Sequence, residues 1–126
     1  MRIFKLKAFA RFQRRERIAG VALATAIANA EAGIIDAELG GGIIKQRVAR
    51  PGQGKSGGFR TVIAYRHGVC AVYLFGFAKS ERTNLDDDEL AYWRQIGRDY
   101  LALDEKLIEA AIVADELSEV KDGDEK

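Results

Sequence analysis

Residues 69–77 form the most continuously apolar part of the chain, and they restrict the fold more than any other feature. Val69, residues 71–75 and Phe77 are apolar, so almost every side chain in the stretch avoids water. This pattern is typical of a central strand that is buried on both faces of a sheet. The sequence therefore predicts a sheet with this strand inside it.

Two further runs with strand character come before this one. The three predicted strands cover Ile43–Arg50, Phe59–Arg66 and Val69–Ala78. His67 and Gly68 suit a two-residue hairpin turn between the second and the third strand. The segment 51–58 (PGQGKSGG) is too rich in glycine for regular structure, so we expect a mobile loop between the first and the second.

Helices are predicted on both sides of this three-strand segment. Polar and apolar side chains alternate over residues 2–7, which predicts a first strand. In the ranges 8–19 and 21–32 the apolar side chains have helical spacing, and Gly33 is expected to end the second helix. Asn84 is expected to cap a helix whose first turn carries the acidic residues 86–89, and residues 107–112 indicate one more helix.

This order predicts an α+β fold. An N-terminal strand and a helical hairpin precede a three-strand antiparallel segment that completes the sheet, and C-terminal helices follow. We expect one domain over residues 1–126, with a frayed acidic tail at 116–126.

The cysteine and histidine counts exclude several kinds of site. The 126 residues include one Cys and one His, which rules out an internal disulfide framework, a cysteine-based zinc site and a two-histidine site. No apolar run reaches the roughly 20 residues of a membrane span, and no signal core follows Met1. We expect a cytoplasmic protein that uses no metal and no cofactor.

Charge is distributed unevenly along the chain. Residues 1–82 hold 15 Lys and Arg against 5 Asp and Glu, whereas residues 83–126 hold 5 against 14. Basic surface of this density attracts polyanions, of which nucleic acid is the commonest in cytoplasm. The acidic part could shield the basic face, oppose a basic partner or keep the protein soluble.

The basic residues are densest around the predicted three-strand segment. They are Lys45, Arg47, Arg50, Lys55, Arg60, Arg66, Lys79 and Arg82. Strand periodicity places Lys45 and Arg47 on one face. That Arg60 joins them is a hypothesis, because apolar Val62 would then share the same face.

Such a cluster can bind phosphate, since guanidinium and ammonium groups form charge-assisted hydrogen bonds with it. Cations around one phosphodiester also stabilise the charge of a pentavalent transition state. RNA supplies its own 2′-OH nucleophile, and a lysine among other cations can accept the proton. Cleavage of RNA without metal or histidine is therefore feasible.

Other motifs are weaker. PGQGKSGG lies between two strands and does not fit a phosphate-binding P-loop. The acids at 86–89 are better explained by the first turn of a helix than by a metal site, and His67 suits a solvated turn.

Two longer runs resemble a known family. Gly40–Arg66 (GGGIIKQRVARPGQGKSGGFRTVIAYR) and Ala71–Leu85 (AVYLFGFAKSERTNL) resemble the RelE-type toxins of bacterial type II toxin–antitoxin modules. Within the RelE/ParE superfamily they look most like the HigB-like branch. The resemblance implies a compact α+β fold and an endoribonuclease that cuts mRNA, typically in the ribosomal A site. It also implies a cognate antitoxin that silences the toxin. In this branch, the antitoxin is a helix-turn-helix DNA-binding protein.

The resemblance also implies which residues act. By motif, the expected catalytic residues are Lys45, Arg47, Arg60, Lys79 and Arg82. Arg50, Lys55 and Arg66 are expected to bind RNA. Ser80 stands where some relatives carry Arg, and Asp86 stands near the place of a catalytic Tyr, so the general base is open, with Lys45 our first choice.

Two alternatives remain open at this stage. The ParE branch inhibits DNA gyrase instead of cutting RNA, and a plain RNA-binding module would leave RNA intact.

Overall fold

The computed structural model describes residues 1–50, 54–82 and 84–121, with only the backbone described for 54–57. Ten elements follow one another along this part of the chain: β1 (Arg2–Leu6), α1 (Lys7–Glu16), α2 (Gly20–Glu31), β2 (Ala37–Gly40), β3 (Ile43–Arg50), β4 (Gly54–Arg66), β5 (Cys70–Ala78), α3 (Asp87–Leu101), α4 (Glu105–Val113) and β6 (Leu117–Glu119). The predicted α+β class is confirmed. None of the helices described is long and apolar enough to cross a membrane.

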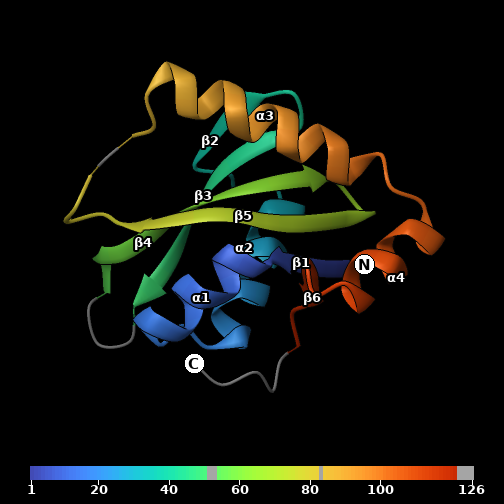
Figure 1. Ribbon diagram of the computed structural model, residues 1–126. Helices are drawn as coiled ribbons and strands as arrows, with labels where there is room; N and C mark the ends of the chain where they lie inside the picture. Colours follow the sequence, from blue (N-terminus) through green and yellow to red (C-terminus); the bar gives the residue numbers. More distant parts are fainter. Residues whose placement is uncertain (51–53, 83, 122–126) are drawn as a thin grey trace.

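The strands form one sheet in the order β2-β3-β4-β5-β1-β6 (Figure 1). β1 is parallel to β5, and every other neighbouring pair is antiparallel. Helices α1 and α2 cover one face, α3 covers the other, and α4 lies at the β1–β6 end. Because β5 lies inside this sheet between two helical layers, it must be apolar on both sides, as its sequence predicts.

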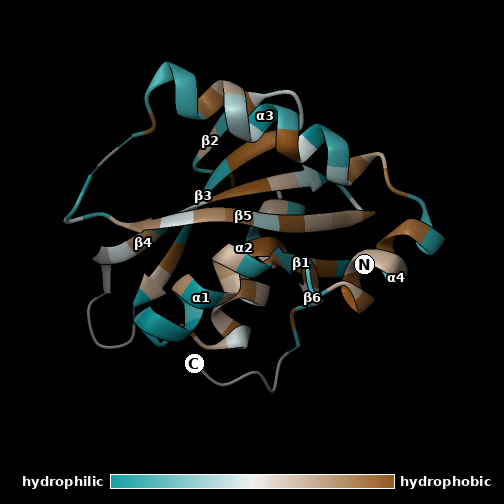
Figure 2. Cartoon of the chain, viewed as in Figure 1, coloured by the Kyte–Doolittle hydropathy of each residue, from teal (hydrophilic) through white to brown (hydrophobic). Residues whose placement is uncertain are grey.

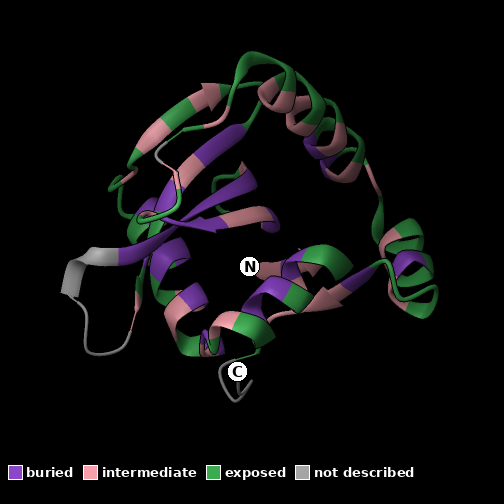
Figure 3. Cartoon of the chain, turned by 60° about the vertical axis from the view of Figure 1, so that its left-hand side comes forward, coloured by how far each residue is buried: buried purple, intermediate pink, exposed green. Residues whose placement is uncertain are grey.

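Each face of the sheet has its own hydrophobic core. Toward α1 and α2, the core is built around Phe9, Phe59 and Tyr73, whose hydroxyl donates to the Leu23 carbonyl at 2.7 Å. Toward α3, Val62 and Leu74 are buried against the inner face of the helix. The central strands β4 and β5 are largely apolar and buried, whereas the helices carry both buried and exposed residues (Figures 2 and 3).

The prediction of a loop over 51–58 is wrong for residues 54–58, because β4 already begins at Gly54. Residues 51–53 lie outside the described part. Gly54 pairs with Arg50, and Gly58 continues the strand so close to β3 that a Cβ there would lie 2.6 Å from the Val48 carbonyl oxygen. Glycine at 58 therefore permits close strand pairing where we expected it to break the strand.

Several element ends differ from the prediction. The helix predicted for 8–19 ends at Glu16, because Arg17 adopts the left-handed conformation (φ 58°). The hairpin turn has three residues, since Arg66 pairs with Cys70. Asp86, not Asn84, caps α3: its carboxylate accepts from the Glu89 amide, and the Glu89 side chain accepts from the Asp86 amide.

The short edge strands β2 and β6 were not predicted. β6 corrects the expectation of a frayed tail at 116–126, because Leu117 is buried at 3% exposure and pairs with Leu6. Arg2 also holds this segment by hydrogen bonds from its guanidinium to Glu119 at 3.0 Å. Residues 122–126 of the predicted tail lie outside the described part.

A buried glutamine ties β3 to the segment that leads into β2. Gln46 is 4% exposed, and its amide nitrogen donates to the carbonyls of Ala26 (3.0 Å) and Ile34 (2.8 Å). Its side-chain oxygen accepts from the Asp36 amide at 2.9 Å. Three backbone groups therefore depend on this one side chain.

We expect Gln46→Leu to lower the free energy of unfolding by about 2–4 kcal/mol, because it keeps the volume but leaves buried backbone groups unpaired. Gln95→Leu is the matched control: Gln95 is exposed on α3, so its loss should cost about 0.5 kcal/mol or less. Urea unfolding of both variants measures the difference. Equal stability of the two variants would contradict this role of Gln46.

Candidate RNA-cleavage site

Two arginines lie directly opposite each other on neighbouring strands. Arg47 of β3 pairs with Arg60 of β4, and Arg60 pairs in turn with Phe77 of β5. Directly paired residues project from the same face of a sheet. We call these three residues the arginine row. The hypothesis that Arg60 shares a face with Lys45 and Arg47 is confirmed.

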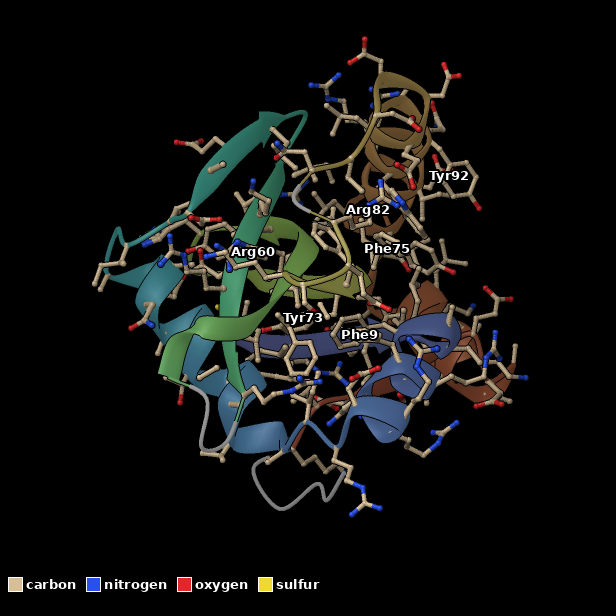
Figure 4. The ribbon with its side chains drawn as sticks, turned by 90° about the vertical axis from the view of Figure 1, so that its left-hand side faces the viewer. Phe9, Arg60, Tyr73, Phe75, Arg82 and Tyr92 are labelled. Atoms are coloured by element: carbon tan, nitrogen blue, oxygen red, sulfur yellow. The ribbon has the colours of Figure 1, made fainter. Side chains whose placement is uncertain are left out.

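The arginine row lies on the α3 side of the sheet, at the end from which the β5–α3 segment (79–86) leaves. In the neighbouring row, Lys45 pairs with Val62, and Val62 with Phe75, whose ring stacks on Trp93 of α3 at 5.4 Å. Figure 4 views the molecule from this end: Arg60, Arg82 and Phe75 lie on one side of the sheet, and Phe9 and Tyr73 on the other. The arginine row thus lies next to the part of the sheet that α3 covers.

Arg60 is buried although it carries a charge. Its side chain is 9% exposed, against 54% for Arg47. The Asp36 carboxylate lies between the two, 3.4 Å from the Arg47 Nε and 3.5 Å from the Arg60 Nε. The Nη1 atom of Arg60 is buried and has no hydrogen-bond partner among the residues that the structure describes. A buried N–H donor without an acceptor is costly, and it marks a place where an anion would be stabilised.

The site is open at the edge formed by Asp36 and Arg47. A groove of about 580 Å³ between α2 and β3 is lined by Asp36 and Arg47, together with apolar residues of both elements. Within the described residues, β2 pairs with β3 only as far as Lys45, so no strand covers the outer edge at Arg47. A ligand can therefore approach Arg47 from the edge of the sheet.

Lys45 lies on the same face as the arginine row. Its Nζ atom donates to the Asn84 side-chain oxygen at 3.0 Å, and the side chain is half-buried. This contact holds the amine between β3 and the β5–α3 segment. Lys79 comes directly after β5, where its amide donates to the Gly58 carbonyl at 3.3 Å. Its backbone therefore lies beside β4, two residues before Arg60.

Arg82 is held by a carboxylate. Its guanidinium forms two hydrogen bonds with the Glu89 carboxylate and donates to the Asn84 carbonyl, and it lies over the Phe77 ring at 5.4 Å. Hydrogen bonds from Arg82 lower the pKa of Glu89, and the amide of Asp86 lowers it further. Arg82 therefore fastens the β5–α3 segment to the first turn of α3.

The three predicted RNA-binding residues are not brought together at this site. Arg50 faces the opposite side of the sheet, where it pairs with Glu16 at 2.9 Å and lies over Phe59. Arg66 is at the far end of β4 and donates to the Leu101 carbonyl at 3.2 Å, at the C-terminus of α3. The side chain of Lys55 lies outside the described part.

Sequence reasoning missed Asp36, Glu89 and Phe77 as neighbours of the site. Asp36 is one of only 5 acidic residues among residues 1–82, and this scarcity was the available signal. Phe77 was assigned to the core, and it is buried at 3% exposure. Its contact with Arg82 depends on a chain reversal that no local pattern shows.

Comparison with known families gives a match that covers most of the chain. The model for the RelE toxin of the RelE/RelB toxin–antitoxin system matches residues 1–120. No curated protein gives a significant match. The matched span includes the arginine row, Lys45 and the β5–α3 segment.

Substituting Arg82 should change the titration of Glu89. We expect Arg82→Gln to raise the pKa of Glu89 toward its ordinary value of 4.5, because the donated hydrogen bonds are lost. Folding lowers the pKa of Glu89, so the ion pair with Arg82 stabilises the folded protein at pH values above the ordinary pKa of a glutamate. This stabilisation is lost as the pH falls through the lowered pKa of the folded protein. An NMR titration of the side-chain carboxyl carbons measures both effects.

Glu31 is the internal control for this titration. Hydrogen bonds from Tyr65 and Gly68 lower the pKa of Glu31, and neither is changed in Arg82→Gln. Its titration should therefore be the same in both proteins. A Glu89 midpoint that does not move would show that Arg82 is not its partner in solution.

Proposed function

We propose that this chain, which belongs to the RelE toxin family, cleaves mRNA with the cations gathered on the α3 side of its sheet. It is a toxin of a toxin–antitoxin system, and toxins of this family generally cleave mRNA. The observation that carries the proposal is the buried and unpartnered Nη1 of Arg60, beside a second arginine on the same face.

The arginine row suits a phosphodiester. Arg47 and Arg60 approach from neighbouring strands, and their terminal amino groups can bind the two non-bridging oxygens of one phosphate. A phosphate oxygen at Nη1 of Arg60 would give that donor its missing acceptor. Because Arg60 is largely desolvated, its charge acts strongly on the negative charge that develops on phosphorus in the transition state.

The reaction needs a proton acceptor and a proton donor. As the 2′-oxygen forms its bond to phosphorus, its proton passes to a base, and the bond from phosphorus to the 5′-oxygen breaks. The products are a 2′,3′-cyclic phosphate and a free 5′-OH, once an acid protonates the leaving oxygen. We assign the base to Lys45, whose amine lies on the face of the arginine row and is held by Asn84.

The remaining predicted catalytic residues take supporting roles. Lys79, at the end of β5, is our candidate for neutralising the leaving oxygen. Arg82 is bound to Glu89 and Asn84, so we assign it to positioning the β5–α3 segment over the site. Neither assignment requires a metal ion.

The proposed partners are a translating ribosome and an antitoxin. The proposed site lies on one face of a chain of 126 residues, and a ribosome that holds the mRNA in its A site would supply the alignment that a small protein lacks. The family implies a cognate antitoxin. By the HigB-like resemblance of the sequence, we propose that this antitoxin is a helix-turn-helix DNA-binding protein.

Arg60→Ala should lower the rate of mRNA cleavage by about 10²–10³-fold, because it removes the charge nearest the proposed phosphate. Arg47→Ala, at a side chain 54% exposed, should fold normally and also lose activity. The control is Arg98→Ala, which removes an exposed arginine from α3. Mapping of new mRNA 5′ ends after brief induction in cells measures cleavage. Full cleavage by both site variants would contradict the assigned site.

Ribosome dependence has its own test. We expect the purified protein to leave a free mRNA largely intact and to cut the same mRNA, in register with its codons, when ribosomes carry it. Equal cleavage with and without ribosomes would contradict ribosome dependence alone. Growth arrest with intact transcripts and inhibited gyrase would instead support the ParE-like alternative.

A further inference from the structure

Asp36 is the acidic residue that the structure places inside the proposed phosphate site. It lies between α2 and β2, where its backbone amide is fixed by the buried side chain of Gln46 at 2.9 Å. Gln46 is itself held by two carbonyls from the α2 region. The backbone of Asp36 is therefore held by a buried side chain.

The carboxylate of Asp36 bridges the two arginines. One oxygen lies 3.4 Å from Nε of Arg47, the other 3.5 Å from Nε of Arg60, and the Asp36 side chain is 19% exposed. Two guanidinium groups directly opposite each other on adjacent strands repel each other. Within the described residues, Asp36 is the only carboxylate that forms an ion pair with either arginine.

The nearest approach of Asp36 is to Nε and not to the terminal amino groups of the two guanidinium groups. Each guanidinium has five N–H donors, and the Asp36 carboxylate comes nearest to the one on Nε, at ion-pair distance. For Arg60, the Nη1 atom stays buried without a partner. A negative charge beside Nε of each planar group favours one orientation of that group, and this orientation decides where the terminal amino groups point.

We propose that Asp36 is a positioning residue, which orients Arg47 and Arg60 so that their terminal amino groups meet the two non-bridging oxygens of the scissile phosphate. The proposal rests on the proposed function of the site. Asp36 does not touch the RNA and transfers no proton. It acts through the two arginines.

Neutralising Asp36 should have opposite effects on RNA binding and on the rate of cleavage. These opposite effects distinguish a positioning role from a structural one. Asp36 reduces the charge of the arginine pair from +2 to +1, so its neutralisation should favour the binding of RNA phosphate. Its neutralisation should also release the orientation of the guanidinium groups and slow the chemical step. A purely structural ion pair predicts instead that binding and turnover fall together with the folded fraction.

The test is single-turnover cleavage of an mRNA on programmed ribosomes over a range of protein concentrations. It compares Asp36→Asn with Glu38→Gln, which removes the same charge from an exposed position two residues away in β2. For Asp36→Asn we expect the maximal rate to fall at least about tenfold while the half-saturating concentration stays equal or decreases. Glu38→Gln should retain the wild-type maximal rate.

Asp36→Glu is the second variant, because it keeps the charge and the fold but moves the carboxylate by one methylene. We expect it to lower the maximal rate as well, with an unchanged midpoint of thermal unfolding. A maximal rate within about twofold of wild type in both Asp36 variants would overturn the proposal. A parallel loss of rate, binding and stability in Asp36→Asn, with full activity in Asp36→Glu, would show a structural ion pair and also overturn it. A wild-type protein that leaves the mRNA intact contradicts the proposed function itself, and the proposal for Asp36 falls with it.

Discussion

A buried guanidinium governs the arrangement around it. Arg60 is 9% exposed in the middle of the sheet, and a charge removed from water requires compensation. Asp36 supplies part of it at Nε, and the hydrogen bonds of Gln46 hold Asp36 in place. The Nη1 donor that stays unpaired is the remaining cost, and an anionic substrate would remove it. The proposed function would thus link stability and activity through one side chain.

The register of the sheet determines which cations can cooperate. The pairing of Arg47 with Arg60, and of Arg60 with Phe77, places two charges and an aromatic ring in one row across three strands. Arg82 then lies over Phe77 because the β5–α3 segment turns back and is fastened to Glu89. A basic residue on the same strands but on the other face, such as Arg50, serves the contact with α1 through Glu16. Density of positive charge in the sequence is therefore a poor guide to which residues share a site.

Much of the fold could be predicted from the sequence because its patterns are local. The apolar run of β5 and the helical spacing of α1 and α2 depend only on neighbouring residues. The predictions fail where pairing with a distant strand determines the local structure. Gly54 belongs to β4 because it pairs with β3, and Leu117 belongs to the edge strand β6 because it pairs with β1.

The candidate site was predictable only in part, for the same reason. Strand periodicity was sufficient to put Lys45 and Arg47 on one face, and the same rule places Arg50 on the other. It was not sufficient for Arg60, because β4 is buried on both faces and its apolar residues do not alternate with polar ones. Asp36 comes from a segment without periodicity, and Glu89 is one of several acidic residues in the first turn of α3. Only the folded chain shows that they meet Arg60 and Arg82.

The most direct test of the central claim is an NMR titration of the ¹⁵N-labelled protein with a short RNA whose 2′-hydroxyls are methylated, so that it binds but cannot be cut. The arginine Nε–Hε signals report each guanidinium group separately. We expect the signals of Arg47 and Arg60 to shift with RNA while those of Arg50 and Arg66 stay in place. Shifts confined to Arg50 or Arg66, with Arg47 and Arg60 unchanged, would contradict the assignment of the phosphate site to the arginine row.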